Sequence, residues 1–350
     1  MEVTDSYEKK VNITLVLIAF LVCLVCPINV ASAADRPETL YRITPDDAEW
    51  KCLNGVQEKI EACRIDEEIL QSMSTEQLIE AVLDYPFIID LFLTDDYESA
   101  VGSICENCDA FHELISRSDA EKTIVEWVEQ RKKAHTGITA EEEIENDAMM
   151  LLLLHTDELA NEITQADVAT LDGFSNMVTV KWESESLNRR AQDIRTPNGT
   201  VVSYITQNCV HTAADFHSRL DEETVSTYNV TLVSSGTCKY NCHSYAWYST
   251  SSNNSAWINN PSAYMTDGSY VNLLNGLGTF SSYVDYGAKI CYGTSSAALH
   301  SAILTSSASN VPLASRVATS KWGRAGVFMH NVSNVPSDYW DNAYNVSAWH

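Results

Sequence analysis

The sequence changes character at the turn signal Thr196-Pro197-Asn198-Gly199-Thr200. Pro fixes φ, while Asn and Gly tolerate positive φ, so this run favours a turn between two folded segments. Nearly all of the net charge of -26 lies before it, because the chain from Pro197 onward holds 8 acidic and 6 basic residues. We therefore predict two domains with different surfaces: an acidic helical one over 35–190 and a second over 196–350.

The first part shows helical patterns from about residue 44 to 190. Ser118 and Asp119 are capping residues before one segment, which ends in Arg131-Lys132-Lys133, a positive last turn that suits the helix dipole. The apolar run 149–154 is too short for a membrane span and indicates a buried helix face. Another segment begins at Ser74 and ends at Tyr85-Pro86, with apolar residues at helical spacing: Leu78, Ile79, Val82 and Leu83.

The second part is rich in Ser, Thr, Asn, Tyr and Gly and contains short β-rich runs. The segment after Cys242 is the best helix candidate there. One helix packed on an antiparallel sheet predicts an α+β fold. The predicted strands cover 201–205, 230–233, 289–292, 301–305, 316–319 and 326–332.

The N-terminus reads as an export signal over residues 1–34. Lys9 and Lys10 precede an apolar run over 13–25, and Ala31-Ser32-Ala33 offers a small-residue cleavage site. We expect a secreted or cell-envelope protein with no stable membrane insertion after cleavage; an uncleaved anchor is the alternative. The acidic charge argues against nucleic acid as a partner, because phosphate binding needs clustered Lys and Arg.

Two residues suggest nucleophilic chemistry. Cys242 follows Asn241, a good N-cap, so its sulfur would lie at the positive end of a helix dipole, where a thiol pKa falls. His300 opens a short apolar strand that could hold an imidazole near the thiol as general base. The alternative for Cys242 is a disulfide with Cys238 or Cys209.

A third group should orient the imidazole of a catalytic histidine. Ser320 ends the strand after His300, and His330 lies on the strand after that, and both are equal candidates. Aromatic and polar residues near the nucleophile are expected to bind substrate, although the aromatic ones could equally be core: Asn241, His243, Tyr245, Trp257 and Trp322.

Other cysteines suggest structure instead of chemistry. Cys105 and Cys108 have the spacing of a metal knuckle, and His112 follows them. Because no second cysteine pair lies at zinc-finger distance, we expect Cys105 and Cys108 to form disulfides in an exported helical bundle. We expect no metal and no cofactor.

A cysteine at a helix start, then a strand opening with His300, then a polar residue ending the next strand resembles the NlpC/P60 and CHAP cysteine hydrolases. A longer pattern is similar to a group of uncharacterised bacterial secreted proteins, whose helical region also resembles residues 78–120. That pattern comprises the runs Tyr240-Asn-Cys-His-Ser-Tyr-Ala-Trp-Tyr248, Trp257-Ile-Asn259, Asp267-Gly-Ser-Tyr270, His300-Ser-Ala302 and Ser320-Lys-Trp-Gly323.

The resemblance implies a papain-like fold for 196–350 and a secreted cysteine peptidase or amidase. Cys242 would attack an amide carbonyl of cell-wall peptide, with His300 as base. The alternatives are a hydrolase of the same fold acting on protein or another amide, and a non-catalytic module that binds cell-wall material.

Overall fold

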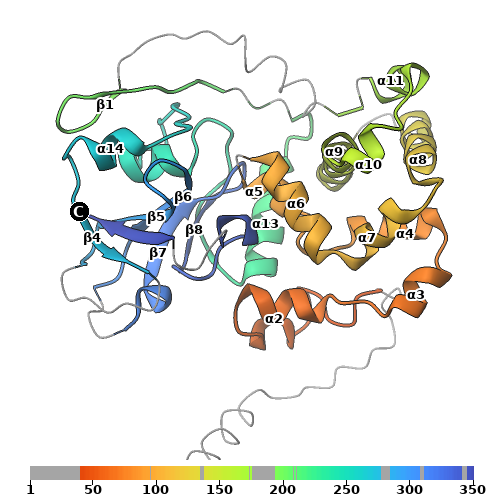
Figure 1. Ribbon diagram of the computed structural model, residues 1–350, viewed down its shortest axis with the longest axis horizontal. Coiled ribbons are helices and arrows are strands. Elements are labelled where there is room, and N and C mark those ends of the chain that lie inside the picture. Colours follow the sequence, from red (N-terminus) through yellow and green to blue (C-terminus); the bar gives the residue numbers. More distant parts are fainter. Residues whose placement is uncertain are drawn as a thin grey trace, which may run out of the picture. The chain divides into compact units, whose positions relative to one another are not determined.

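A computed structural model describes residues 40–94, 96–134, 138–172, 174–175, 194–207, 209, 211–276, 284–307, 311–340 and 345–350. The predicted signal peptide lies outside these residues. Residues 41–350 form one compact unit, and the chain is an α+β protein (Figure 1). No helix in the described part of the chain is long and apolar enough to cross a bilayer.

The first part of the chain is helical, as its patterns predicted. Side-chain caps explain several helix starts, because Ser74, Thr139 and Thr164 each form a capping box with the third helical residue. The elements are η1 (Trp50–Cys52), α2 (Gly55–Ala62), α3 (Glu67–Ser72), α4 (Thr75–Leu83), α5 (Asp90–Leu93), α6 (Tyr97–Asn107), α7 (Asp109–Ser116), α8 (Ala120–Ala134), α9 (Ala140–His155), α10 (Asp157–Ala160) and α11 (Gln165–Leu171).

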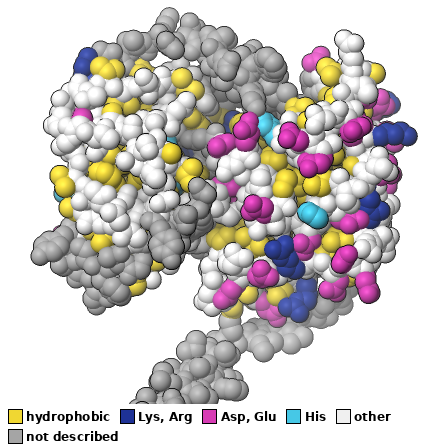
Figure 2. Space-filling model, viewed as in Figure 1, with side chains coloured by type: hydrophobic (Ala, Val, Ile, Leu, Met, Phe, Trp, Pro, Cys, Tyr) yellow, Lys and Arg dark blue, Asp and Glu magenta, His cyan; other side chains and the backbone are white. Residues whose placement is uncertain are grey.

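The predicted buried helix face is confirmed. Residues 149–153 of α9 are all buried, and α8 ends in the predicted basic turn at Arg131, Lys132 and Lys133. Figure 2 shows acidic and basic side chains gathered over the helical part, whereas the visible face of the sheet part carries few. The charge asymmetry of the sequence therefore follows the two kinds of structure.

The second part is built on a seven-stranded antiparallel sheet with strand order β3-β8-β7-β6-β5-β9-β4. All six predicted strands have counterparts, whereas β1, β4 and β9 were not predicted. The strands are β1 (Ile194–Arg195), β2 (Val201–Val202), β3 (Thr231–Ser234), β4 (Asn272–Asn275), β5 (Lys289–Gly293), β6 (Ala298–Leu304), β7 (Val317–Lys321), β8 (Val327–Asn331) and β9 (Val346–Trp349). The pair β1–β2 forms a separate two-stranded ribbon.

Helices cover both faces of this sheet. The longest in the second part, α13, was not predicted, although Phe216, Leu220 and Thr224 recur at helical spacing and are buried. It lies between the sheet and the helical part (Figure 1). The segment after Cys242 is helical as predicted, but only for one wide turn. The elements are α13 (Phe216–Tyr228), the π-helical turn η2 (Ser244–Tyr248), α14 (Ser262–Thr266), η3 (Leu313–Ser315) and η4 (Ser337–Trp340).

Strand register assigns side chains to the two faces of the sheet. Cys291 lies opposite Ser301, and Tyr292 lies opposite His300. Because residues alternate along a strand, Ser301 and His300 point to opposite faces. The Ser301 face packs against η2 and α14 in a core that includes Trp247 and Cys291. The His300 face packs against η4.

Buried hydrogen bonds join the helical part to the sheet part. The Tyr228 hydroxyl donates to Asp90 Oδ1 at 2.5 Å, and Trp50 Nε1 donates to the Thr227 carbonyl at 2.9 Å. The Arg324 N–H donates to the Phe92 carbonyl at 2.8 Å. The end of α13 and the turn between β7 and β8 are thus both tied to the helical part.

Candidate active site

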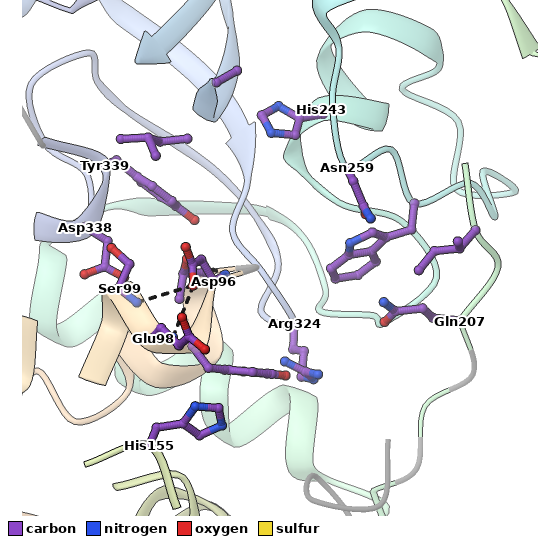
Figure 3. Close-up of a pocket in the computed structure, with 16 residues that line it drawn as sticks. Asp96, Glu98, Ser99, His155, Gln207, His243, Asn259, Arg324, Asp338 and Tyr339 are labelled. Carbon is purple, nitrogen blue, oxygen red and sulfur yellow. Dashed lines mark hydrogen bonds between the residues drawn. The ribbon is translucent and has the colours of Figure 1, made fainter. Parts of the chain in front are cut away.

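A cavity of about 580 Å³ opens between the helical part and the sheet part. One wall is formed by the start of α6 and by η4, and the opposite wall by His243, Asn259 and Gln207 (Figure 3). The first residues of β6, Ala298 and Leu299, also line it. It is large enough for a peptide or sugar fragment, since ligand pockets are typically about 300–1,000 Å³.

The cavity carries both signs of charge. Asp96 caps α6, where its Oδ1 accepts the N–H groups of Glu98 and Ser99 at 3.1 and 3.3 Å. The Arg324 guanidinium lies 5.2 Å from the Tyr97 ring centroid. Burial raises the pKa of Asp338 to about 7. A ligand with both a cationic and an anionic group would find partners in this cavity.

Cys242 begins the helical segment that leads into η2, as predicted. The Asn241 side chain caps it, because Oδ1 accepts the Ser244 N–H at 3.1 Å and Nδ2 donates to the Ile258 carbonyl at 2.8 Å. Asn241 therefore supports this turn and the 256–258 segment and is itself buried. The Cys242 side chain is a thiol, not half of a disulfide, in a residue that is 2% exposed.

The predicted substrate-binding residues fall into two groups. His243 and Trp257 line the cavity. Tyr245 instead stacks with Tyr240, their centroids 6.4 Å apart, and Trp322 is fully buried against Tyr228 in a T-shaped contact with centroids 5.0 Å apart. Neither Tyr245 nor Trp322 is among the cavity-lining residues.

The predicted base His300 does not line the cavity, although the preceding residue, Leu299, does. Tyr339, which lines the cavity, stacks on the His300 ring with centroids 4.0 Å apart. Within the described residues, neither ring nitrogen of His300 has a hydrogen-bond partner. The predicted hydrogen bond to Cys242 is therefore not formed in the structure. The physical reason is the register, because η2 packs against Ser301 on the other face of the sheet.

Burial keeps the buried histidines near the cavity neutral. It lowers the pKa of His300 well below its usual value, with further lowering by His330 and His243. Burial also lowers the pKa of His243 to about 4. The His300 imidazole is therefore neutral and has a nitrogen that can accept a proton, but its lowered pKa makes it a weaker base than an exposed histidine.

The two candidates for the orienting residue contact each other instead of His300. The Ser320 hydroxyl lies 2.7 Å from His330 Nε2, and Trp322 Nε1 donates to Ser320 Oγ at 2.8 Å. The other ring nitrogen of His330 lies 2.8 Å from the Asn331 carbonyl oxygen, which can only accept, so Nδ1 carries the proton. Ser320 thus donates to Nε2, and the tautomer of His330 is fixed.

Two clusters of metal-ligating groups were missed from the sequence. One comprises Cys209, His217 and Cys238, and the other comprises Glu143, Asp147 and His211. The spacing of Glu143 and Asp147, four residues apart on α9, was a weak signal for the second cluster, and the separation of eight residues between Cys209 and His217 gave none for the first. The expected disulfides of Cys105 and Cys108 are not formed, since both residues are thiols.

Comparison with known proteins gave no match to a family model, to a curated protein or to a solved structure.

Proposed function

We propose that this protein is a secreted cysteine hydrolase of papain-like type that cleaves amide bonds in cell-wall peptide. The observation that supports the proposal is that sequence neighbours of the two predicted catalytic residues line one cavity. His243, directly after Cys242, and Leu299, directly before His300, both line it. The mixed charges of the cavity suit a short peptide with free amino and carboxylate groups.

In the proposed reaction, His300 takes the proton of the Cys242 thiol as the sulfur attacks the amide carbonyl carbon. The tetrahedral intermediate collapses, the C–N bond breaks, and the imidazolium protonates the leaving amine. Water then adds to the thioester, with His300 again accepting a proton, and the carboxylic acid and the thiol are released. The Ser244 N–H already donates to Asn241, so the oxyanion would need other N–H groups at the helix start.

This chemistry requires the Cys242 sulfur and a His300 nitrogen to approach within hydrogen-bond distance in the substrate complex. In the structure η2 packs on the Ser301 face of the sheet and His300 points to the opposite face, so this approach requires a rearrangement of the segment around Cys242 when substrate binds. The unpartnered nitrogens of His300 support this requirement, because no existing hydrogen bond must break first. Ser320 and His330 are both proposed as orienting residues, and each would have to give up its present partner.

A non-catalytic module that binds cell-wall material is the second candidate. The lack of a Cys242–His300 hydrogen bond favours it, and so does the deep burial of both side chains. In that case His243, Trp257 and Arg324 would hold the ligand in the same cavity. The two candidates differ in whether bonds are cleaved.

Purified muropeptides and a denatured protein, incubated separately with the mature chain, test the proposal. We expect new amino groups to be released from muropeptides by the wild type, and a loss of at least about 10³-fold in Cys242→Ala, as removal of a catalytic nucleophile causes. Cys291→Ala is the control, because Cys291 is also a buried thiol but lies in the core of the sheet. Equal release by Cys242→Ala and the wild type would refute the catalytic role.

Thiol labelling must be designed around a second cysteine. Cys209 is an exposed thiol, and hydrogen bonding to Cys238 lowers its pKa below the usual value of a thiol. It would therefore react with an alkylating reagent before Cys242 does. Labelling of Cys242 is best measured by peptide mapping in a Cys209→Ser background.

A further inference from the structure

Three metal-ligating side chains from separate segments meet beside the start of α13. His217 Nε2 lies 3.2 Å from Cys209 Sγ and 3.8 Å from Cys238 Sγ. The three donor atoms all lie within 4.8 Å of one another. We propose that Cys209, His217 and Cys238 bind a zinc ion.

The distances between the donor atoms fit a tetrahedral ion. Zinc–sulfur bonds of about 2.3 Å and zinc–nitrogen bonds of about 2.1 Å place neighbouring ligand atoms roughly 3.5–3.8 Å apart. The observed sulfur–nitrogen distances of 3.2 and 3.8 Å bracket that range. The nitrogen is therefore already placed for zinc relative to both sulfurs, and the two sulfurs lie within 4.8 Å of each other.

The histidine ring is already turned for metal binding. His217 Nδ1 lies 3.0 Å from the Arg324 carbonyl oxygen, which can only accept a hydrogen bond. The proton is therefore on Nδ1, and the lone pair of Nε2 faces the two sulfurs. Zinc-binding histidines characteristically donate their second N–H to a carbonyl or carboxylate in this way.

Thiolate and imidazole ligands select zinc over the oxygen-preferring cations. Cys209 is exposed, so a water molecule can occupy the fourth position, whereas Cys238 is buried. Zinc would tie α13 to the loop that leads to Cys242, four residues after Cys238. It would also fix the backbone of Arg324, whose side chain lines the cavity. The proposal is independent of whether Cys242 is a nucleophile.

The test uses the full mature chain, purified under reducing conditions and then dialysed against zinc or cobalt. We expect about one zinc ion per chain by elemental mass spectrometry. The cobalt form should show a sulfur-to-cobalt charge-transfer band, which only cysteine ligands give. Zinc should also protect Cys209 from alkylation.

Variants assign the ion to this cluster. His217→Gln and Cys209→Ser should each lower zinc content about tenfold or more and remove the cobalt–thiolate band. Cys209 is exposed, so the Cys209→Ser variant is expected to fold and can be used if the His217→Gln variant does not. Asp147→Asn, in the neighbouring Glu143–Asp147–His211 cluster, and Cys105→Ser are matched controls that should retain both signals.

Three results would overturn the proposal. One is that Cys209 and Cys238 form a disulfide and that the chain, after this disulfide is reduced, binds no zinc. Another is a cobalt form without a thiolate band. The third is zinc uptake that persists in His217→Gln and disappears in Asp147→Asn.

Discussion

At the residue scale, two buried serines of the sheet, Ser301 and Ser320, each contact one tryptophan and one histidine. Ser301 Oγ accepts from Trp247 Nε1 at 2.8 Å and lies 2.8 Å from His243 Nδ1. Ser320 has the equivalent partners in Trp322 and His330. Each serine satisfies a buried indole N–H and a buried imidazole nitrogen, so each tryptophan–histidine pair depends on one hydroxyl group.

Ser301→Ala should therefore lower the free energy of unfolding by about 2–4 kcal/mol, because two buried polar atoms lose their partner. Chemical denaturation measures the change. Ser255→Ala, at an exposed serine, is the control and should stay within about 0.5 kcal/mol of wild type. A Ser301 variant as stable as the control would show that the buried network contributes nothing.

The neutral histidines predict a pH dependence of stability. Burial lowers the pKa of His330 from 6.5 to about 4. The unfolded chain therefore binds this proton more readily, and stability from the neutral ring is complete above pH 6.5 and is lost as pH falls toward 4. The variant His330→Gln replaces the titratable imidazole with an amide, which does not bind a proton in this pH range but can still form hydrogen bonds.

Between pH 6.5 and 4.5, wild type should lose about 2–3 kcal/mol more unfolding free energy than His330→Gln, at about 1.4 kcal/mol per pH unit for one proton. Asp147 and Asp338, whose pKa values burial raises to about 7, act in the opposite direction but equally in both proteins. Parallel stability curves for the two proteins would contradict the neutral, buried state of His330.

At the element scale, the turn between β7 and β8 depends on Gly323. Its φ is 41°, and a Cβ there would overlap the backbone of Phe92 and Leu93. The next residue, Arg324, donates its N–H to the Phe92 carbonyl at 2.8 Å. The absence of a side chain lets this turn pack directly on α5.

Gly323→Ala should lower the unfolding free energy by about 2–4 kcal/mol, because neither backbone can yield without losing that hydrogen bond. Gly287→Ala is the matched control, since Gly287 has a φ of 89° but open space around its Cα. It should cost about 1 kcal/mol through backbone strain alone. Equal costs for the two variants, measured by thermal unfolding, would show that the close approach to α5 is unimportant.

Local signals explain which elements could be predicted. Capping residues and apolar spacing located α4 and α8, the apolar run 149–154 indicated part of α9, and β-rich runs between turns located six strands. The strand β9 (Val346–Trp349) was missed because four residues with no flanking turn signal give no periodicity. Helix α13 was missed because half of its buried positions are polar (Asp221, Thr224 and Thr227), which weakens the apolar pattern, and its stability comes from tertiary packing.

Of the predicted substrate-binding residues, His243 and Trp257 line the cavity, whereas the relative placement of Cys242 and His300 could not be predicted from the sequence. Cys242 begins a helical segment and His300 lies in a strand, as their neighbours indicated. Which face His300 takes depends on strand register, which long-range pairing decides and no local pattern reveals. The Cys209–His217–Cys238 cluster was missed for the same reason, since three separate segments form it.

At the scale of the whole molecule, the sequence predicts two domains with different surfaces, and in the structure residues 41–350 form one compact unit. The predicted boundary near residue 196 adjoins residues 176–193, which lie outside the described part of the chain. Buried hydrogen bonds such as Tyr228 to Asp90 cross between the helices and the sheet part. These contacts link the stability of the two parts.

We therefore expect the mature chain to unfold in one cooperative transition. Far-UV circular dichroism, which reports mainly the helices, and tryptophan fluorescence should give coincident denaturation curves. Asp90→Ala should shift both curves by the same amount. Two separated transitions would contradict this expectation and would show that the two predicted domains unfold independently.

The central claim, that Cys242 attacks an amide carbonyl, is tested most directly by trapping the covalent intermediate. Muropeptide is mixed with the mature chain, quenched in acid within the first turnovers, and the Cys242 peptide is analysed by mass spectrometry. The proposal predicts a substrate-derived acyl group in thioester linkage to Cys242, absent from Cys242→Ala. Cleavage of muropeptide with an unmodified Cys242, or an acyl group on Cys209 instead, would contradict it.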